Sequence, residues 1–182
     1  STHENEESFC LKAHASLKEK YKDILTIIVP RHIERSSKIK SLSEKLNYNT
    51  QLLNEGDLIL DNKEIVIINF FGVLQEYFKY SKSVFIGKSV NEKLKNDSGQ
   101  NPIDAAKLGC KIYHGPYVNN FKDIYDLLEK NNISKKIETF EELSKNLIKD
   151  LEFPDKKNNL SNQIIEMLGQ KTLSDTIKKI NN

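Results

Sequence analysis

The feature that most constrains the fold is an alternation between short apolar runs and segments with helical spacing. Ile24 to Val29 is a compact run of strand length, rich in β-branched residues, and Pro30 ends it. Apolar residues recur at helical spacing in residues 4–21 before it and 33–46 after it. Strands that are apolar throughout belong to parallel sheets covered on both faces. The pattern therefore predicts an α/β fold with a Rossmann-like, doubly wound parallel sheet.

The rest of the chain continues this alternation. Further strands are expected at residues 58–60, 64–69, 83–87, 111–114 and 133–137. Further helices are expected at residues 71–80, 102–108, 120–130 and, with breaks near Pro154 and Gly169, 141–180. Residues 91–100 read as a loop. Ser1 or Thr2 is predicted to cap the first helix, with Glu4 closing a capping box.

Composition narrows the functional classes. The 182 residues suit one domain, residues 1–182, and a net charge of +2 provides no broad basic field for nucleic acid. Cys10 and Cys110 lie far apart and lack metal-ligand spacing, which favours a reducing compartment and predicts no metal site. The longest apolar runs are too short to span a bilayer. Composition therefore suits a soluble globular domain, and any anion site in it must be local.

In doubly wound folds, ligands bind beyond the carboxyl ends of the strands. Arg31 follows the strongest predicted strand and Pro30, at the start of the next helix. An arginine there can bind a phosphate bidentately, helped by helix amide groups. The alternative is an ordinary surface pair between Arg31 and Glu34 or another carboxylate. The local residues leave both interpretations open.

Further polar groups follow other predicted strands. Asn101 is expected to cap a helix whose first turn contains Pro102 and Asp104, a carboxylate that could accept hydrogen bonds from ribose hydroxyls. Plain capping explains the same residues. Gly87-Lys88-Ser89 is not a P-loop, because Lys82 stands where that motif requires glycine.

Two other segments carry histidine. His114 precedes Gly115-Pro116, and Asn120 is predicted to cap the following helix. His3 lies among Glu4, Glu6 and Glu7, where an acidic helix start is a better explanation than a metal site.

Taken in order, four motifs resemble the Kdo (3-deoxy-D-manno-octulosonate) transferases. They are Ser1-Thr2-His3-Glu4-Asn5-Glu6-Glu7, Val29-Pro30-Arg31-His32-Ile33-Glu34-Arg35, Gly99-Gln100-Asn101-Pro102-Ile103-Asp104, and Gly115-Pro116 with Asn120-Phe121-Lys122-Asp123. The resemblance implies the C-terminal, donor-binding half of a GT-B glycosyltransferase. That family transfers Kdo from CMP-Kdo to a lipid A precursor, with inversion, in lipopolysaccharide synthesis at the cytoplasmic face of the inner membrane of Gram-negative bacteria.

The resemblance also implies a nucleotide-sugar site. Its residues would be Pro30, Arg31, Phe71, Gly72, Val73, Asn101, Pro102, Ile103 and Asp104, with His3, Glu4, Ser89 and Asn120 as further candidates. It implies no metal or other cofactor, and no catalytic residue within this chain. The general base, the acceptor site and the membrane anchor would belong to an N-terminal domain.

The chain departs from the family at four places. Gln100 stands for a usual His, and Asp104 for a Glu. Asn69-Phe70-Phe71-Gly72-Val73-Leu74 replaces Asp-Thr-Met-Gly-Glu-Leu, and Lys88 replaces the second glycine of Gly-Gly-Ser. Two alternatives therefore stay open: a GT-B transferase or epimerase for another nucleotide sugar, and a non-catalytic nucleotide-binding or interaction domain.

The opening of the chain suggests a fragment of a longer protein. The resemblance implies that a further central strand precedes Ser1. We expect a chain without that strand to expose backbone and apolar surface, and to be weakly stable or self-associating. We also expect it to be inactive alone, since transfer needs a base within hydrogen-bond reach.

Overall fold

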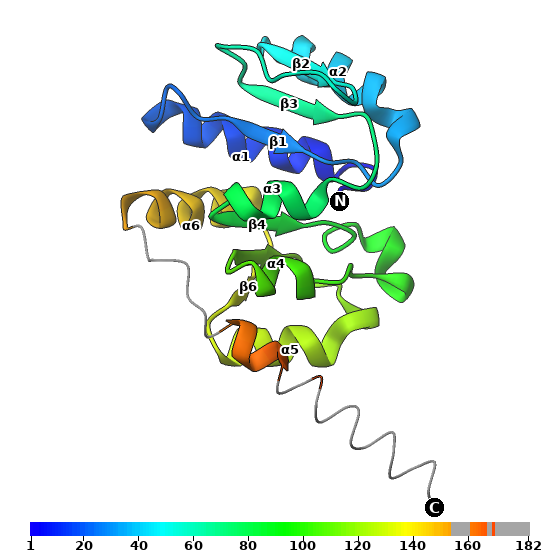
Figure 1. Cartoon of the computed structure of the whole chain (residues 1–182), viewed down its shortest axis with the longest axis vertical. Helices are drawn as coiled ribbons and strands as arrows, with labels where there is room; N and C mark the ends of the chain where they lie inside the picture. Colours follow the sequence, from blue (N-terminus) through cyan, green and yellow to red (C-terminus); the bar gives the residue numbers. More distant parts are fainter. Residues whose placement is uncertain (154–160, 167–168, 170–182) are drawn as a thin grey trace, which may run out of the picture.

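The structure is a computed structural model, and it describes residues 1–153, 161–166 and 169 (Figure 1). The helices are α1 (Glu6–Lys20), α2 (Ser36–Lys45), α3 (Leu74–Tyr80), α4 (Ile103–Lys107), α5 (Lys122–Lys130) and α6 (Phe140–Glu152). The strands are β1 (Thr26–Ile28), β2 (Thr50–Leu53), β3 (Ile65–Ile68), β4 (Ser83–Ile86), β5 (Lys111–His114) and β6 (Ser134–Lys136). Short 3₁₀ turns are η1 (Ile33–Arg35), η2 (Glu92–Asp97) and η3 (Asn119–Phe121).

The strands form two parallel sheets of three strands each. Their orders are β1-β3-β2 and β4-β5-β6, so each sheet has its most buried strand in the middle. All four residues of β3 are buried, because the strand is covered on both faces. Helices flank both sheets (Figure 1). The predicted α/β, Rossmann-like class is therefore confirmed.

Residues 1 and 2 connect the carboxyl ends of the two sheets. Thr2 forms an isolated parallel bridge with Pro30: its N–H donates to the carbonyl of Val29 at 2.9 Å, and its carbonyl accepts the N–H of Arg31 at 2.9 Å. On the other side, a Cβ atom at Gly87 would lie 2.3 Å from the carbonyl oxygen of Ser1. Only glycine permits that approach, so Ser1 and Thr2 lie between the ends of β1 and β4.

Helices α1 and α6 lie side by side and join the two halves of the core (Figure 1). One apolar cluster contains Ala13 of α1, Tyr113 of β5 and Leu143 of α6. Asp150 of α6 accepts hydrogen bonds from the hydroxyl of Tyr113 at 2.7 Å and from that of Ser83 at 2.5 Å. In the described ranges, no helix is both long and apolar enough to cross a membrane.

The predicted capping box is wrong. Helix α1 begins at Glu6, and Asn5 occupies the cap position with a φ of 73° and no capping side-chain hydrogen bond. Thr2 cannot cap the helix because its backbone pairs with Val29 and Arg31.

The predicted strand at 58–60 is also wrong. Those residues form an exposed loop, and the strand missed by the periodicity is β2. The side chain of Gln51 in β2 bonds the carbonyl of Leu58 and the N–H of Leu60, so the loop lies along β2 without pairing as a strand.

Other predicted boundaries also shift. Residues 92–97 of the expected loop form η2, and α4 begins at Ile103, with Pro102 at the cap position. The long C-terminal helix predicted for 141–180 is α6 up to Glu152 and is helical again at 161–166 and 169. The remainder of that prediction lies outside the described residues.

Candidate functional site

Most of the candidate residues follow the carboxyl ends of strands. Pro30 and Arg31 follow β1, residues 71–73 follow β3, Ser89 follows β4, and Asn120 follows β5. Because the strands in each sheet are parallel, these segments share the edge at which doubly wound folds bind ligands. The bridge between Thr2 and Pro30 connects the two halves of that edge.

Arg31 is exposed at this edge, and its guanidinium makes no hydrogen bond or ion pair with any residue that the structure describes. Its backbone is held, since its N–H donates to the carbonyl of Thr2. Glu34, the suggested alternative partner, instead faces His32, with 3.6 Å between Nδ1 and Oε1. The alternative pair with Glu34 is therefore not formed, and the Arg31 cation is free to meet an anion.

The segment after β3 presents an aromatic ring. Phe71 is 69% exposed, and Gly72 has a φ of 87° with no atom within 4 Å of a Cβ built on it. Val73 instead packs against the cluster formed by Leu53, Val66 and Ile68, so it positions the turn. Asn69, where the resemblance would place Asp, donates from Nδ2 to Oδ1 of Asn54 at 2.9 Å.

The segment before α4 is pre-organised by its own side chains. Oδ1 of Asn101 accepts the N–H of Ile103 at 2.9 Å, and Pro102 is buried beside them. The carboxylate of Asp104 is exposed and has no side-chain hydrogen bond within the described part of the chain. The NH₂ group of Asn101 can therefore donate a hydrogen bond to a ligand, and the carboxylate of Asp104 can accept hydrogen bonds from one.

Glu6 organises the loop after β4. Its side chain is fully buried, and its carboxylate accepts four backbone N–H groups, from His3 at 2.8 Å, Lys88 at 2.7 Å, Ser89 at 2.9 Å and Val90 at 3.2 Å. Such bonds to a carboxylate are strong, and the loop therefore has one defined conformation. Sequence reasoning missed this role, because nothing in the motif distinguishes Glu6 from its acidic neighbours.

Ser89 lies in the same loop with its side chain fully buried. Its hydroxyl donates to the carbonyl of Ile86 at 2.7 Å and accepts the N–H of Gly115 at 2.9 Å. A Cβ at Gly115 would lie 2.1 Å from the carbonyl oxygen of Ser89, so only glycine fits there. Ser89 thus ties the loop after β4 to the loop after β5.

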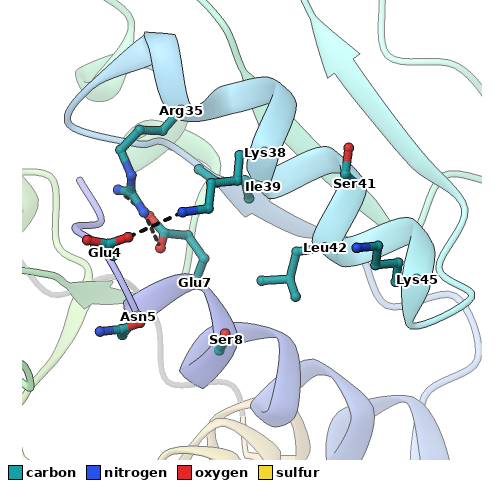
Figure 2. A pocket seen from close by; sticks show the side chains of 10 residues that line it. All are labelled: Glu4, Asn5, Glu7, Ser8, Arg35, Lys38, Ile39, Ser41, Leu42 and Lys45. Atoms are coloured by element: carbon teal, nitrogen blue, oxygen red, sulfur yellow. Dashed lines mark hydrogen bonds and ion pairs between the residues drawn. The ribbon is translucent and has the colours of Figure 1, made fainter.

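A second buried carboxylate joins α1 to the start of α2. Glu7 forms a bidentate pair with Arg35, with both N–O distances at 2.9 Å (Figure 2). The exposed pair of Lys38 with Glu4, at 3.3 Å, lies beside it. Both pairs border a hollow of about 240 Å³ between α1 and α2, whose apolar lining includes Leu42.

Burial lowers the pKa of two histidines near the edge, His3 and His114. Burial and, to a smaller extent, the nearby charge of Lys88 together lower the pKa of His3 to about 4. Its ring lies edge-on to His32, with 5.7 Å between centroids. Burial also lowers the pKa of His114, whose Nδ1 lies 2.8 Å from the carbonyl oxygen of Gly115. In the residues described, no three His, Cys, Asp or Glu side chains lie close enough to hold a metal ion.

The fold and the polar groups at its carboxyl edge define a class of protein. Parallel α/β sheets that present an unpaired arginine, a glycine turn and a pre-organised helix start at their carboxyl edge have the architecture of doubly wound domains, which bind ligands at that edge.

Comparison with known proteins identifies relatives of similar sequence. No family model matches the chain. It is 28% identical over 145 residues to the 3-deoxy-D-manno-octulosonic acid transferase of Aquifex aeolicus, covering 79% of this chain and 38% of that protein. It is 28% identical over 128 residues to the transferase of the same name from Haemophilus influenzae, covering 70% of this chain and 29% of the relative. The chain thus spans about a third of the length of these relatives.

A solved structure has the same fold. The crystal structure of the C-terminal CMP-Kdo binding domain of WaaA from Acinetobacter baumannii matches with a TM-score of 0.78 and 24% identity, over 92% of this chain and 86% of that one. The resemblance to the Kdo transferases that the four motifs predicted is therefore confirmed, and so is the Rossmann-like fold of their C-terminal domain.

Proposed function

We propose that this chain is the donor-binding domain of a glycosyltransferase that moves Kdo from CMP-Kdo to a lipid A precursor in lipopolysaccharide synthesis. The observation that carries the proposal is the free, exposed guanidinium of Arg31 at the carboxyl edge of a parallel sheet. The relatives named 3-deoxy-D-manno-octulosonic acid transferase and the CMP-Kdo binding domain with the same fold support the choice of donor.

In this proposal each segment of the edge binds one part of the donor. Arg31, positioned by Pro30, binds the phosphate, since a guanidinium matches phosphate oxygens bidentately. Asn101 and Asp104, in the turn completed by Pro102 and Ile103, bind the ribose hydroxyls. Phe71 and Gly72 border the cytosine ring, with Val73 anchoring their turn. His3, Glu4, Ser89 and Asn120 surround or position these groups. No metal ion takes part.

The transfer step itself would need more than this domain. A sugar acceptor must lose a proton to a base within hydrogen-bond reach, and we propose that a carboxylate of a second, N-terminal domain supplies it and that the anomeric carbon is inverted. The chain matches only 29% to 38% of its relatives' length, which is consistent with such a two-domain enzyme. That second domain would also hold the lipid A precursor and attach the enzyme to the cytoplasmic face of the inner membrane.

One observation favours a second candidate, a GT-B domain for another nucleotide sugar. Asn69 is engaged with Asn54, and Val73 is packed into an apolar cluster, at positions where the resemblance would place two carboxylates. A changed base pocket could accept uracil or guanine.

A nucleotide panel tests the proposal against this alternative. Isothermal calorimetry of the chain with CMP, UMP and GMP should give heat of binding with CMP and a clearly weaker affinity for the other two. Preference for UMP or GMP would favour the alternative. If none of the three nucleotides binds, the remaining interpretation is an interaction domain without a donor site.

A further inference from the structure

Lys88 adopts a backbone conformation that lysine disfavours. Its φ is 58°, in the left-handed region, where most residues other than glycine are strained. Its backbone is fixed on both sides: the N–H donates to Glu6 at 2.7 Å, and the carbonyl accepts the N–H of Gly99 at 2.7 Å. A strained residue at the candidate ligand-binding edge points to a functional role for that residue.

The Lys88 side chain reaches Asp97, at the end of η2. It is only 18% exposed, and its ammonium group lies 2.7 Å from Oδ2 of Asp97. The other carboxylate oxygen of Asp97 accepts a hydrogen bond from Nδ2 of Asn120 at 2.7 Å. Lys88 follows β4 and Asn120 lies in η3, after β5, so two neighbouring strand ends provide two donors aimed at one carboxylate.

Among the residues that the structure describes, only these two donors hold the side chain of Asp97. Its side chain is 78% exposed, and an exposed ion pair is worth little, so the carboxylate can rotate into solvent at low cost. The backbone around it is secured independently. Nδ2 of Asn119 donates to the carbonyl of Lys95 at 2.7 Å, and the N–H of Asn120 donates to the carbonyl of Ser98 at 3.0 Å. Displacing the Asp97 side chain therefore leaves η2 in place.

The pair also borders the other candidate segments. Lys88 contributes to lowering the pKa of His3, so its charge lies near the start of the chain. Its carbonyl is bonded to Gly99, two residues before Asn101. An anion held by Lys88 and Asn120 would therefore lie beside a nucleotide bound at this edge.

We propose that Lys88 and Asn120 form an anion clamp for the donor, and that Asp97 occupies the clamp as an internal substitute until the donor's anionic oxygens displace it. This inference rests on the proposed function. The clamp accepts a pair of oxygens on one negatively charged group, which both the phosphate and the sugar-acid carboxylate of CMP-Kdo provide.

The test depends on substitutions of Lys88 and Asp97 changing the affinity for CMP-Kdo in opposite directions. Lys88→Met should weaken CMP-Kdo binding about tenfold, because a charge-assisted hydrogen bond is lost. Asn120→Ala should weaken it by a smaller factor. Asp97→Ala should tighten it about two- to fivefold, since an exposed competitor of modest energy is removed. If the three residues only stabilise the loop, removing either partner of the ion pair should instead change affinity in the same direction.

Two matched variants control for charge and folding. Lys95→Met removes a positive charge from an exposed position in η2 and should leave the affinity for CMP-Kdo unchanged. Lys88→Arg keeps the positive charge and should retain most of the wild-type affinity. Cytidine, which has no anionic group, should bind equally to all variants. Effects seen with CMP assign the clamp to phosphate, and effects confined to CMP-Kdo assign it to the sugar carboxylate.

Three results would overturn the clamp while the proposed function stands: equal affinities for wild type and Lys88→Met, weaker binding by Asp97→Ala, or equal effects on cytidine. If wild type binds neither CMP nor CMP-Kdo, both the clamp and the proposed function are overturned.

Discussion

The carboxylate of Glu6 accepts the backbone N–H of Ser89 at 2.9 Å, and this bond joins the start of α1 to the loop after β4 across 83 residues of sequence. Together with the bonds from His3, Lys88 and Val90, it makes one buried carboxylate the common support of two candidate segments. The shape of the site therefore depends on a residue that does not line it.

The first prediction is that Glu6→Gln destabilises the domain. The amide's NH₂ group would face backbone donors and leave at least one buried N–H without an acceptor, at a cost of about 2–3 kcal/mol in the free energy of unfolding. Urea unfolding followed by circular dichroism measures it. Glu4→Gln, at an exposed neighbour, should change stability by less than about 0.5 kcal/mol. Equal effects of the two substitutions would refute the supporting role of Glu6.

The second prediction concerns the pair of Glu7 with Arg35. A double-mutant cycle with Glu7→Gln and Arg35→Met should give a coupling energy of about 1–3 kcal/mol, because the pair is bidentate and mostly buried. The same cycle on Glu4 and Lys38 should give less than about 0.5 kcal/mol, because that pair is exposed. A coupling at Glu7 and Arg35 no larger than the exposed pair's would contradict this account.

The third prediction is a loss of stability on acidification. Burial lowers the pKa of His14 from 6.5 to about 4, and its Nδ1 lies 2.9 Å from the hydroxyl oxygen of Thr26. Between those two pH values the unfolded chain binds a proton that the folded chain does not, so the free energy of unfolding falls as pH falls. Near pH 5 this one histidine contributes a slope of about 1.4 kcal/mol per pH unit.

Urea titrations at several pH values between 7 and 4.5 measure that slope. His14→Gln should reduce the slope of the free energy of unfolding against pH by about 1.4 kcal/mol per pH unit. The contributions of His3 and His114 to that slope should remain. An unchanged slope in the variant would show that His14 is not held neutral by the fold.

The fourth prediction tests the strain at Lys88. Lys88→Gly should be more stable than Lys88→Ala by about 1 kcal/mol, since alanine retains the unfavourable left-handed conformation and glycine does not. At Lys95, whose φ is negative, the order should reverse. Differential scanning calorimetry of the four variants measures these differences in stability. If the alanine variant is more stable than the glycine variant at both positions, Lys88 is not strained.

Much of the fold was predictable because its signals are local. The β-branched run before Pro30 contains the strand β1, the apolar run at 65–68 is the fully buried strand β3, and residues 111–114 are a strand with the predicted bounds. Their parallel pairing follows from the helices between them. The exposed run at 58–60 is as apolar as a strand, whereas β2 begins with two polar residues, so local composition favoured the wrong segment.

The candidate site was predictable in part. Segments that follow strands, such as Arg31 and residues 71–73, could be found because the carboxyl edge is a general property of the fold. The roles of Glu6 and Asp97 could not, since each depends on partners from distant segments: backbone N–H groups of residues 88–90 for Glu6, and Lys88 with Asn120 for Asp97. Long-range hydrogen bonds of this kind leave no periodic signal.

The central claim is that this chain binds the cytidine nucleotide of a sugar donor through Arg31. Calorimetric titration of CMP into wild type, Arg31→Ala and Lys45→Ala tests it most directly, because Lys45→Ala removes an exposed charge from the far end of α2. We predict that wild type and Lys45→Ala bind CMP alike and that Arg31→Ala binds at least about tenfold more weakly. Equal affinity of wild type and Arg31→Ala, or no binding of CMP by wild type, would contradict the account.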